Sequence, residues 1–374
     1  SKFLIKKVYL SAYESIPGGF GQIKIKANRE LIDLINQGTL IVNYVGHGSP
    51  RQWAHESVFN MSRDLNRIDN QGKLTFFVAA TCDFGKYDDP LETSFSEALV
   101  WKKNSGAIGV LASVRLVYSG QNAEFNERFY NYLFPSGQAS VPLGIAKLQA
   151  TLSNVNDQKY HLFADPTLML SDPRSEIRIS SITPPDTLKA LSEVEVNAEV
   201  LEGANVNTNF SGGAVLIIND AVIDSVNTGG NIYYKLPGPT LFKGEVTVSE
   251  GLINGKFIVP KSIRFENQNT GRITLFAWDE NNLSSGLGYN KNLLFLGSTN
   301  LDNTDGPDID IYFEDRENFS DGDLIQSKPV LIATIQDENG NNMTGETGHI
   351  ISLQIDDNNP EDVSGYFFYE NDSY

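Results

Sequence analysis

The chain has 374 residues, and 40% of them are hydrophobic. It contains one cysteine and carries a formal net charge of −18. The length predicts two or three globular domains, while the negative charge excludes the basic footprint that nucleic-acid binding needs. A lone cysteine, Cys82, excludes a scaffold held by disulfides within this chain. The longest apolar runs are strand-sized, so we predict no transmembrane helix, and no amino-terminal signal peptide is visible.

The first 175 residues alternate between strand and helix patterns. Residues 28–37 place their apolar side chains on one helical face, and Gly38 stands where a helix should stop. Ser94 and Glu97 form a plausible capping box for a helix that runs to about Trp101. Further helices are predicted at 125–133 and 142–152. Near-continuous apolar runs, typical of strands buried on both faces of a parallel sheet, lie at 39–45, 74–81 and 107–112. The alternation predicts an α/β sheet with right-handed crossovers.

After residue 175 the pattern becomes that of an all-β protein. Residues 194–200 alternate strictly between apolar and polar, and turn residues separate further predicted strands at 213–218, 244–248, 256–259 and 272–278. This spacing predicts an immunoglobulin-like β-sandwich over 176–298. A polar stretch leads into 299–374, which reads as the start of a further β domain with strands at 309–313, 330–335 and 365–369.

Two side chains with catalytic potential follow consecutive buried strands. His47 stands between Gly46 and Gly48 after the first strand, and Cys82 ends the second. Adjacent parallel strands bring their carboxyl ends to one sheet edge, so we expect His47 and Cys82 to meet there. A thiol nucleophile needs an imidazole that stabilises the thiolate and later protonates the leaving amine. The amides of Gly48 and Cys82 could form an oxyanion hole, where losing one donor typically costs about 3 kcal/mol.

Other interpretations of these residues stay open at this stage. A lone cysteine at a strand end is more often a packing residue, and it is the pairing with His47 that favours catalysis. A zinc site at this pair would lack the three or four protein ligands that such sites usually have. Calcium could bind Asp83, Asp88 and Asp89, although an exposed acidic loop is the simpler interpretation, and we predict no other cofactor. We assign structural or surface roles to the remaining histidines, His55, His161 and His349.

These segments resemble a known family. Residues 43–49, with Trp53 shortly after, look like the catalytic-histidine segment of the gingipain-type cysteine peptidases, and residues 75–82 look like their nucleophile strand. Matching segments follow in the same order at 95–99, 106–113 and 163–168. The resemblance covers about residues 1–175 and implies a caspase-like α/β fold with His47 as general acid/base and Cys82 as nucleophile. It also implies that the region around Trp53 and Tyr118 borders the substrate pocket.

Within this family, residues 80–84, 87–90 and 115–119 are more similar to the sortases of type IX secretion than to the gingipain proteases. That resemblance implies an enzyme at the outer-membrane surface of a Gram-negative bacterium. It would remove carboxy-terminal secretion signals from cargo proteins and transfer the cargo to anionic lipopolysaccharide, with outer-membrane components of the secretion machinery as partners. The alternatives are a gingipain-like protease that hydrolyses its acyl-enzyme, and a catalytically incomplete fragment that acts as an interaction module.

One departure from the family concerns the acidic residue that orients the histidine. In the family this residue lies in a subdomain that precedes the catalytic histidine, and the segment before His47 is too short to hold that subdomain. Glu30 and Asp33 fall on the predicted helix 28–37, where we expect them to be solvated. We therefore expect the chain to be one piece of a longer or processed protein.

Overall fold

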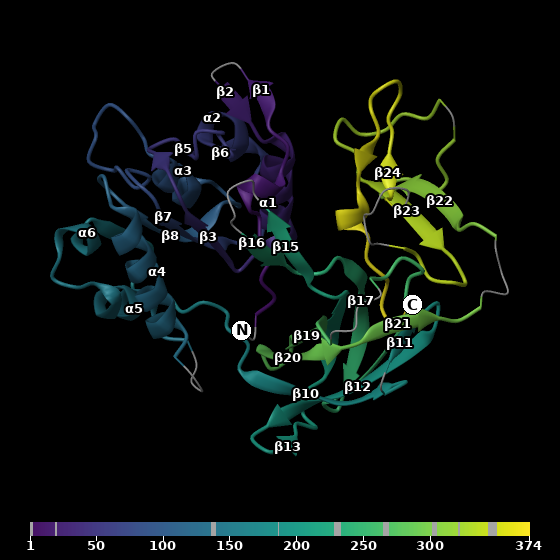
Figure 1. Ribbon diagram of the computed structural model, residues 1–374. Helices are drawn as coiled ribbons and strands as arrows, with labels where there is room; N and C mark the ends of the chain where they lie inside the picture. The colour runs from purple at the N-terminus through teal and green to yellow at the C-terminus, as the bar shows by residue number, and fades with distance from the viewer. Residues whose placement is uncertain are drawn as a thin grey trace. The chain divides into compact units, whose positions relative to one another are not determined.

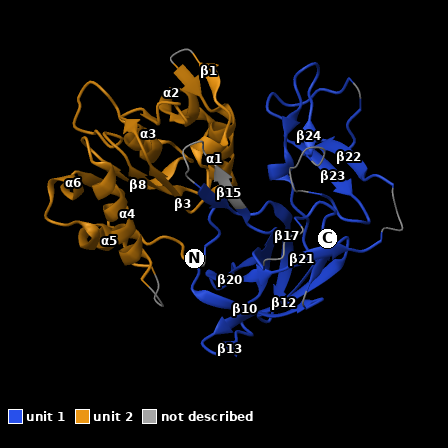
Figure 2. Cartoon of the chain, in the orientation of Figure 1, with its two compact units in different colours: residues 1–6, 173–374 blue, residues 7–172 orange. Residues whose placement is uncertain are grey.

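The computed structural model describes residues 3–18, 21–135, 140–185, 187–227, 233–264, 269–300, 305–320, 322–342 and 350–374. The chain divides into two compact units, drawn in different colours in Figure 2. Unit 2 is Lys7–Asp172, and unit 1 comprises Ser1–Lys6 with Pro173–Tyr374. The predicted division into three domains, 1–175, 176–298 and 299–374, stays a prediction, and His349 lies outside the described residues.

A four-stranded sheet with the order β3–β7–β8–β9 forms the centre of the described part of unit 2 (Figure 1). Its strands are β3 (Ile41–Val45), β7 (Thr75–Ala80), β8 (Ala107–Ser113) and β9 (Tyr160–Phe163). The first three are mutually parallel, as predicted, and every residue of β7 is buried because both faces of the sheet are covered. The antiparallel edge strand β9 was not predicted, since its four residues carry no continuous apolar or alternating pattern.

Helices cover both faces of this sheet. On one face lie α1 (Ile25–Gly38) and α3 (Phe95–Trp101), where Ile35 and Leu99 share a core with Phe77. On the other face lie α4 (Ser119–Leu133) and α5 (Leu143–Ala150), where Phe125 shares a core with Phe76. Successive side chains of β7 therefore pack into two separate cores, one on each face of the sheet. The prediction of a caspase-like α/β fold is confirmed for this sheet and its helices.

Local signals in the sequence explain where two of these helices begin and end. Glu97 N–H donates to the Ser94 hydroxyl, and Ser94 N–H donates to the Glu97 carboxylate at 2.8 Å, so the predicted capping box is formed. Gly38 closes α1 with φ of +101°, a backbone conformation that only glycine adopts without strain. The remaining elements of unit 2 are short: η1 (Leu10–Ala12), β1 (Ile16–Gly18), β2 (Gly21–Ile23), β4 (Gly48–Ser49), β5 (Gln52–Trp53), β6 (Phe59–Asn60), α2 (Met61–Asp64), η2 (Leu65–Arg67) and α6 (Val155–Gln158).

Unit 1 is β-rich, and its main sheet closes on itself. The strand order is β10–β20–β19–β14–β17–β18–β12–β13, and β10 also pairs with β12. The pairing of β10 with β12 closes seven of the described strands into a barrel-like ring. The eighth strand, β13, pairs only with β12 and lies outside the ring. The strands are β10 (Ser175–Thr183), β12 (Glu193–Glu202), β13 (Asn205–Val206), β14 (Gly212–Asn219), β17 (Thr240–Ser249), β18 (Leu252–Ile258), β19 (Gly271–Asp279) and β20 (Ser284–Leu293).

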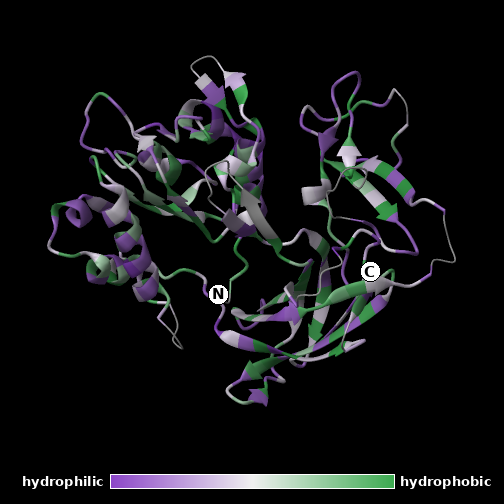
Figure 3. Cartoon of the chain, viewed as in Figure 1, coloured by the Kyte–Doolittle hydropathy of each residue, from purple (hydrophilic) through white to green (hydrophobic). Residues whose placement is uncertain are grey.

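This ring corrects the prediction of a two-sheet immunoglobulin-like sandwich. The individual strands are as predicted, and hydrophobic and hydrophilic residues alternate along them (Figure 3). However, two residue pairs join β17 to β18, and two more join β10 to β20, so hydrogen bonds bridge what would be the open corners of a sandwich. Sequence alternation reveals which side chains face inward, but it does not reveal whether the edge strands meet.

The rest of unit 1 consists of short antiparallel or parallel pairs. Its other elements are β11 (Leu188–Ala190), β15 (Ile223–Asn227), β16 (Tyr233–Leu236), β21 (Phe295–Ser298), β22 (Asp308–Phe313), β23 (Leu331–Gln336), β24 (Ser352–Leu353), β25 (Glu361–Asp362) and η3 (Ser364–Tyr366). The expected strand at 365–369 is replaced by η3 and a single bridge of Tyr369 to Gly244. Tyr369 is buried and stacks on Phe242 with ring centroids 4.6 Å apart. None of the described helices is both long and apolar enough to span a membrane.

Candidate active site

The register of the parallel sheet brings the two predicted catalytic segments to one edge. Val45, the last residue of β3, pairs with Ala80, the last residue of β7. His47 and Cys82 each follow two residues beyond that pair, and Gly46 N–H continues the contact by donating to the Ala80 carbonyl at 3.5 Å. Because parallel strands in register end at the same level, both side chains start from the carboxyl edge of the sheet.

Gly48 brings the histidine segment into direct contact with the cysteine segment. A Cβ atom at Gly48 would lie 2.4 Å from Oγ1 of Thr81, the residue before Cys82. No side chain fits in so short a distance, so packing requires a glycine after His47. Gly46 is equally constrained, because a Cβ atom there would lie 2.6 Å from the hydroxyl oxygen of Tyr44. The glycines that flank His47 thus let the chain pass close to β7 and to Tyr44.

Two donors hold the backbone of His47 in place. The Tyr44 hydroxyl donates to the His47 carbonyl at 2.7 Å, and Ala54 N–H donates to the same oxygen at 2.8 Å. Burial raises the pKa of Tyr44 to about 12, so this hydroxyl stays a donor across the physiological range. Ala54 has a φ of 59°, a left-handed conformation that costs about 1–2 kcal/mol in a residue other than glycine. Such strain is retained where the surrounding structure demands it.

Trp53 is the packing support of this arrangement. Its indole ring is 1% exposed and stacks on Tyr44 with ring centroids 4.5 Å apart and 3° between the planes. Phe59 and Phe84 contact its other sides. The resemblance implied that the region around Trp53 borders the substrate pocket; the ring itself offers no surface to a substrate here and instead fixes Tyr44, which binds the His47 carbonyl.

The thiol of Cys82 lies against the loop that follows β8. It contacts the Val117 backbone in both directions, with Sγ 3.4 Å from the Val117 nitrogen and 3.5 Å from the Val117 oxygen. The N–H donor would stabilise a thiolate at this position, since hydrogen bonds to a charged acceptor are the stronger kind. Tyr118, the next residue, is 72% exposed, and its predicted place at the border of the pocket stays a prediction.

Tyr160 is near enough to Cys82 for the charge of a thiolate to affect its hydroxyl. Its ring is buried and stacks on Phe125 with centroids 4.2 Å apart. Burial, with a smaller contribution from the neighbouring Cys82, raises the pKa of Tyr160 well above its ordinary range. Its hydroxyl is buried and has no hydrogen-bond partner among the described residues.

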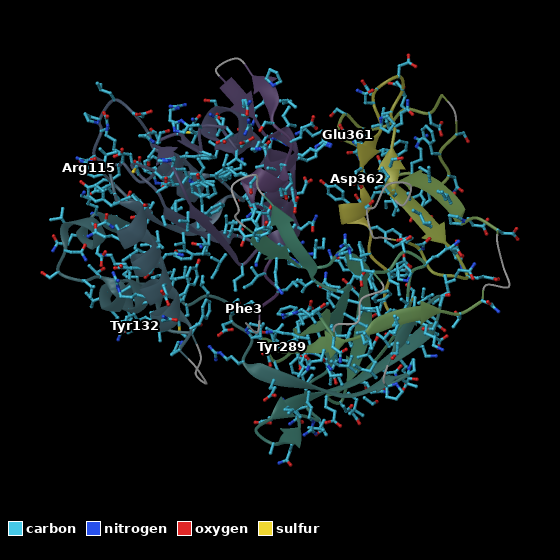
Figure 4. The ribbon with its side chains drawn as sticks, viewed as in Figure 1. Phe3, Arg115, Tyr132, Tyr289, Glu361 and Asp362 are labelled. Carbon is cyan, nitrogen blue, oxygen red and sulfur yellow. The ribbon has the colours of Figure 1, made fainter. Side chains whose placement is uncertain are left out.

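The loop after Cys82 is held by the loop after β8. Asp83 has a φ of 56°, and its N–H donates to the Arg115 carbonyl at 3.4 Å. The Ser113 hydroxyl donates to the Thr81 carbonyl at 2.5 Å. Arg115, labelled in Figure 4, forms an ion pair with Asp88, which holds the pKa of that carboxyl below its usual value. Hydrogen bonds and an ion pair therefore join the two loops on either side of Cys82.

The two amides predicted for the oxyanion hole have compatible surroundings. The hydrogen bond from Ala54 N–H to the His47 carbonyl shows that these two residues form a hydrogen-bonded pair next to β4 and β5. Hydrogen-bonded and non-hydrogen-bonded pairs alternate along antiparallel strands, so the next pair, Gly48 and Trp53, is of the non-hydrogen-bonded kind. The N–H of Gly48 consequently points away from β5. The N–H of Cys82 has no acceptor among the described residues. That these amides form an oxyanion hole stays a prediction.

The remaining polar residues fall into other roles. Glu30 is exposed on α1 and accepts a hydrogen bond from Tyr13, and Asp33 lies on the same helix. Asp89 pairs with Lys86 at 2.9 Å. Within the described parts of the chain, no group of three or more His, Cys, Asp or Glu side chains could hold a metal ion.

Sequence reasoning missed several residues around this pair. His55, assigned a structural or surface role, lies with its ring centroid 5.5 Å from that of His47. Neither the Val117 backbone nor the Tyr160 hydroxyl was linked to Cys82, because loop closure and an edge strand bring them there. Tyr44 lay within the segment that carried the resemblance, and its position three residues before His47 was the available signal.

A mainly parallel α/β sheet with a histidine and a cysteine at its carboxyl edge is the arrangement expected of an α/β cysteine peptidase. In agreement, residues 1–171 match the family model described as Peptidase family C25. This part of the chain is therefore similar to the C25, gingipain-type peptidases, and it contains the one cysteine of the sequence, Cys82. No curated protein sequence matches the chain.

Solved structures of this family are similar at low identity. Dimeric latent PorU from Porphyromonas gingivalis shares 21% identity with a TM-score of 0.38, and the match covers 72% of this chain and 28% of that chain. The Arg-specific cysteine proteinase gingipain R (RgpB) shares 18% identity with a TM-score of 0.35, and the match covers 71% of this chain and 55% of that one. The complex of Porphyromonas gingivalis RgpB pro- and mature domains shares 17% identity with a TM-score of 0.36, and the match covers 71% of this chain and 56% of that one.

Proposed function

We propose that this chain carries the catalytic pair of a cysteine endopeptidase with transpeptidase activity, in which Cys82 is the nucleophile and His47 the general acid and base. The observation that carries the proposal is the contact of Gly48 with Thr81, which joins the two residues adjacent to the catalytic pair. The register of Val45 with Ala80 supports it, since it leaves His47 and Cys82 level at the sheet edge.

The first half of the reaction forms a thioester. The Cys82 thiolate attacks the carbonyl carbon of the scissile peptide bond, and the new C–S bond pushes an electron pair onto the carbonyl oxygen. The amides of Gly48 and Cys82 stabilise that oxyanion. When the oxyanion collapses, the C–N bond breaks and the His47 imidazolium gives its proton to the departing amine.

The second half releases the acyl group. An incoming amine or water loses a proton to His47 and attacks the thioester carbon, and the C–S bond breaks to restore the Cys82 thiolate. An amine acceptor makes the enzyme a sortase, whereas water makes it a hydrolytic protease. The sequence segments 80–84, 87–90 and 115–119 favour the sortase, because they are more similar to the type IX secretion sortases than to the proteases.

In the sortase form of the proposal, the substrates are cargo proteins that carry a carboxy-terminal secretion signal. The enzyme removes this signal and passes the cargo to an amine on anionic lipopolysaccharide. It works at the cell surface, associated with the outer membrane of a Gram-negative bacterium and with outer-membrane components of the type IX machinery. The net charge of −18 suits such a surface protein.

The nucleophile is tested by labelling. Because Cys82 is the sole cysteine of the sequence, a thiol-reactive peptide electrophile should add one mass increment to the chain and none to a Cys82→Ala variant. A His47→Ala variant should label at least about tenfold more slowly, since it loses the base that stabilises the thiolate. His161→Ala is the matched control and should label at the rate of the unchanged chain. Equal rates for both histidine variants would remove His47 from the mechanism.

The reaction type is tested on cargo from cells that carry Cys82→Ala in the full-length protein. Cargo that keeps its carboxy-terminal signal would support Cys82 as the nucleophile of maturation. In cells with the unchanged protein, lipopolysaccharide-linked cargo supports the sortase, and free carboxyl termini support the hydrolytic protease. Cargo that is trimmed and conjugated normally without Cys82 would leave the chain with the role of an interaction module.

A further inference from the structure

A cavity of about 800 Å³ lies beside the edge strand of the unit 2 sheet. Its walls come from β9, from α5 and from the segment that follows β9, and they are mainly apolar. Ile145 and Leu148 of α5 line it and stay 45% and 69% exposed. The volume falls within the range of about 300–1,000 Å³ that is usual for binding pockets. The proposed chemistry of His47 and Cys82 makes no use of this cavity.

The strand that borders the cavity presents unpaired backbone groups at Leu162. Val114 N–H donates to the Lys159 carbonyl at 2.9 Å, which marks a hydrogen-bonded pair just beyond the ends of β8 and β9. Pairs alternate along an antiparallel ladder, so Tyr160 and Leu162 occupy non-hydrogen-bonded positions. Their N–H and C=O groups therefore point away from β8 and have no hydrogen-bond partner among the described residues, but Tyr160 is only 1% exposed, so Leu162 is the residue that presents such groups at the surface. An edge of this kind is a template for an added strand.

The charge on the cavity is cationic. Lys147 is half-buried in the wall, and no acidic partner for it is present in the described part of the chain. The cavity lining contains no aspartate or glutamate, although the sequence has 47 acidic residues against 29 basic ones. Burial lowers the pKa of Lys147. Burial and the charge of Lys147 also lower the pKa of His161, and the charge of Asp88 offsets part of that decrease. A ligand carboxylate would supply the missing partner of Lys147.

We infer that this cleft binds an extended peptide, which pairs with the sheet edge at Leu162, places apolar side chains against Ile145 and Leu148, and pairs a carboxylate with Lys147. Three independent features point to the same occupant. The unpaired edge selects an extended backbone, the apolar wall selects alternating apolar side chains, and the lysine selects an acidic group. The inference does not depend on catalysis by Cys82.

The test is a binding titration with the Cys82→Ala form of the whole chain, which excludes cleavage of the probe. The probe is a short fluorescein-labelled peptide of alternating valine and threonine with one central glutamate, followed by fluorescence anisotropy. Lys147→Glu should weaken binding about tenfold or more, because it replaces an attraction by a repulsion. Lys103→Glu, which makes the same charge change at an exposed site before β8, should leave the affinity unchanged. A probe with lysine in place of glutamate should recover affinity for Lys147→Glu.

Strand addition is tested on the probe alone, so that no protein variant is needed. N-methyl groups on alternate residues remove the donors of one edge of an extended peptide and leave those of the other. One of the two N-methylated isomers should lose binding, while the other keeps it. Equal binding of both isomers, or equal loss in the two lysine variants, would overturn the proposal. So would sedimentation data in which the chain itself dimerises and the probe fails to compete.

Discussion

Gly48 lies directly against the side chain of Thr81, so that a Cβ atom on Gly48 would come within 2.4 Å of the Thr81 hydroxyl oxygen. Each of these residues is the immediate neighbour of a catalytic candidate, His47 in one case and Cys82 in the other. Their contact sets how close the imidazole and the thiol segments can lie. Even a methyl group at Gly48 should therefore disturb this contact.

Replacing Gly48 by alanine should separate the two segments. We expect Gly48→Ala to lower the free energy of unfolding by about 1–3 kcal/mol, the usual cost of overpacking. We expect catalytic efficiency to fall by about a hundredfold, because a displacement of about 1 Å at reacting groups has that effect. Chemical denaturation and peptide-cleavage kinetics measure the two quantities. Gly120→Ala is the stability control, since a Cβ atom there meets nothing within 4 Å, and a loss of stability in that variant would remove packing as the explanation.

The Tyr44 hydroxyl should position His47 without touching the substrate. Tyr44→Phe keeps the stack on Trp53 but removes one of two donors to the His47 carbonyl. We expect a loss of about 1 kcal/mol in the free energy of unfolding, the net worth of one hydrogen bond. The turnover number should fall severalfold with little change in KM. Tyr132→Phe, at the exposed tyrosine labelled in Figure 4, should change neither quantity. An unchanged turnover number for Tyr44→Phe would show that Ala54 N–H alone holds the loop.

The Tyr160 hydroxyl should be a cost to the unliganded fold. It is buried and has no hydrogen-bond partner among the described residues. Tyr160→Phe removes an unsatisfied polar group, so the free energy of unfolding should stay equal or rise by about 1 kcal/mol. Thermal denaturation measures this. A clear loss of stability would mean that the hydroxyl has a partner in solution, such as a water molecule bound at the thiol.

Alkaline pH should destabilise the chain through its buried tyrosines. Burial raises the pKa of Tyr44 and of Tyr369 from the usual 10.0 to about 12. The neutral form is favoured in the folded state, so its contribution to stability is complete below pH 10 and is lost as the pH rises through 12. The thermal midpoint should therefore fall over this interval. In Tyr44→Phe and Tyr369→Phe the fall should be shallower than in the exposed control Tyr132→Phe, and identical slopes would contradict the assignment.

The sequence by itself determined the three parallel strands of the central sheet and the candidate catalytic pair. Apolar runs that are buried on both faces leave a parallel strand as the simplest solution, and this predicted β3, β7 and β8. Two such strands in succession must end at one edge, which predicted the meeting of the His47 and Cys82 segments. Strict alternation over 194–200 predicted β12 for the same reason, and turn residues between apolar runs predicted β14 and β19 as strands.

Only the tertiary structure decided how these elements are completed. The closure of the β-rich unit into a ring depends on pairing between strands that are distant in sequence, such as β10 with β20. The stack of Trp53 on Tyr44, the contact of Val117 with Cys82 and the open edge of β9 likewise arise between segments that no periodicity connects. The local sequence pattern indicates whether a residue is buried. Which residue it contacts in the folded protein is decided by the packing of the whole core.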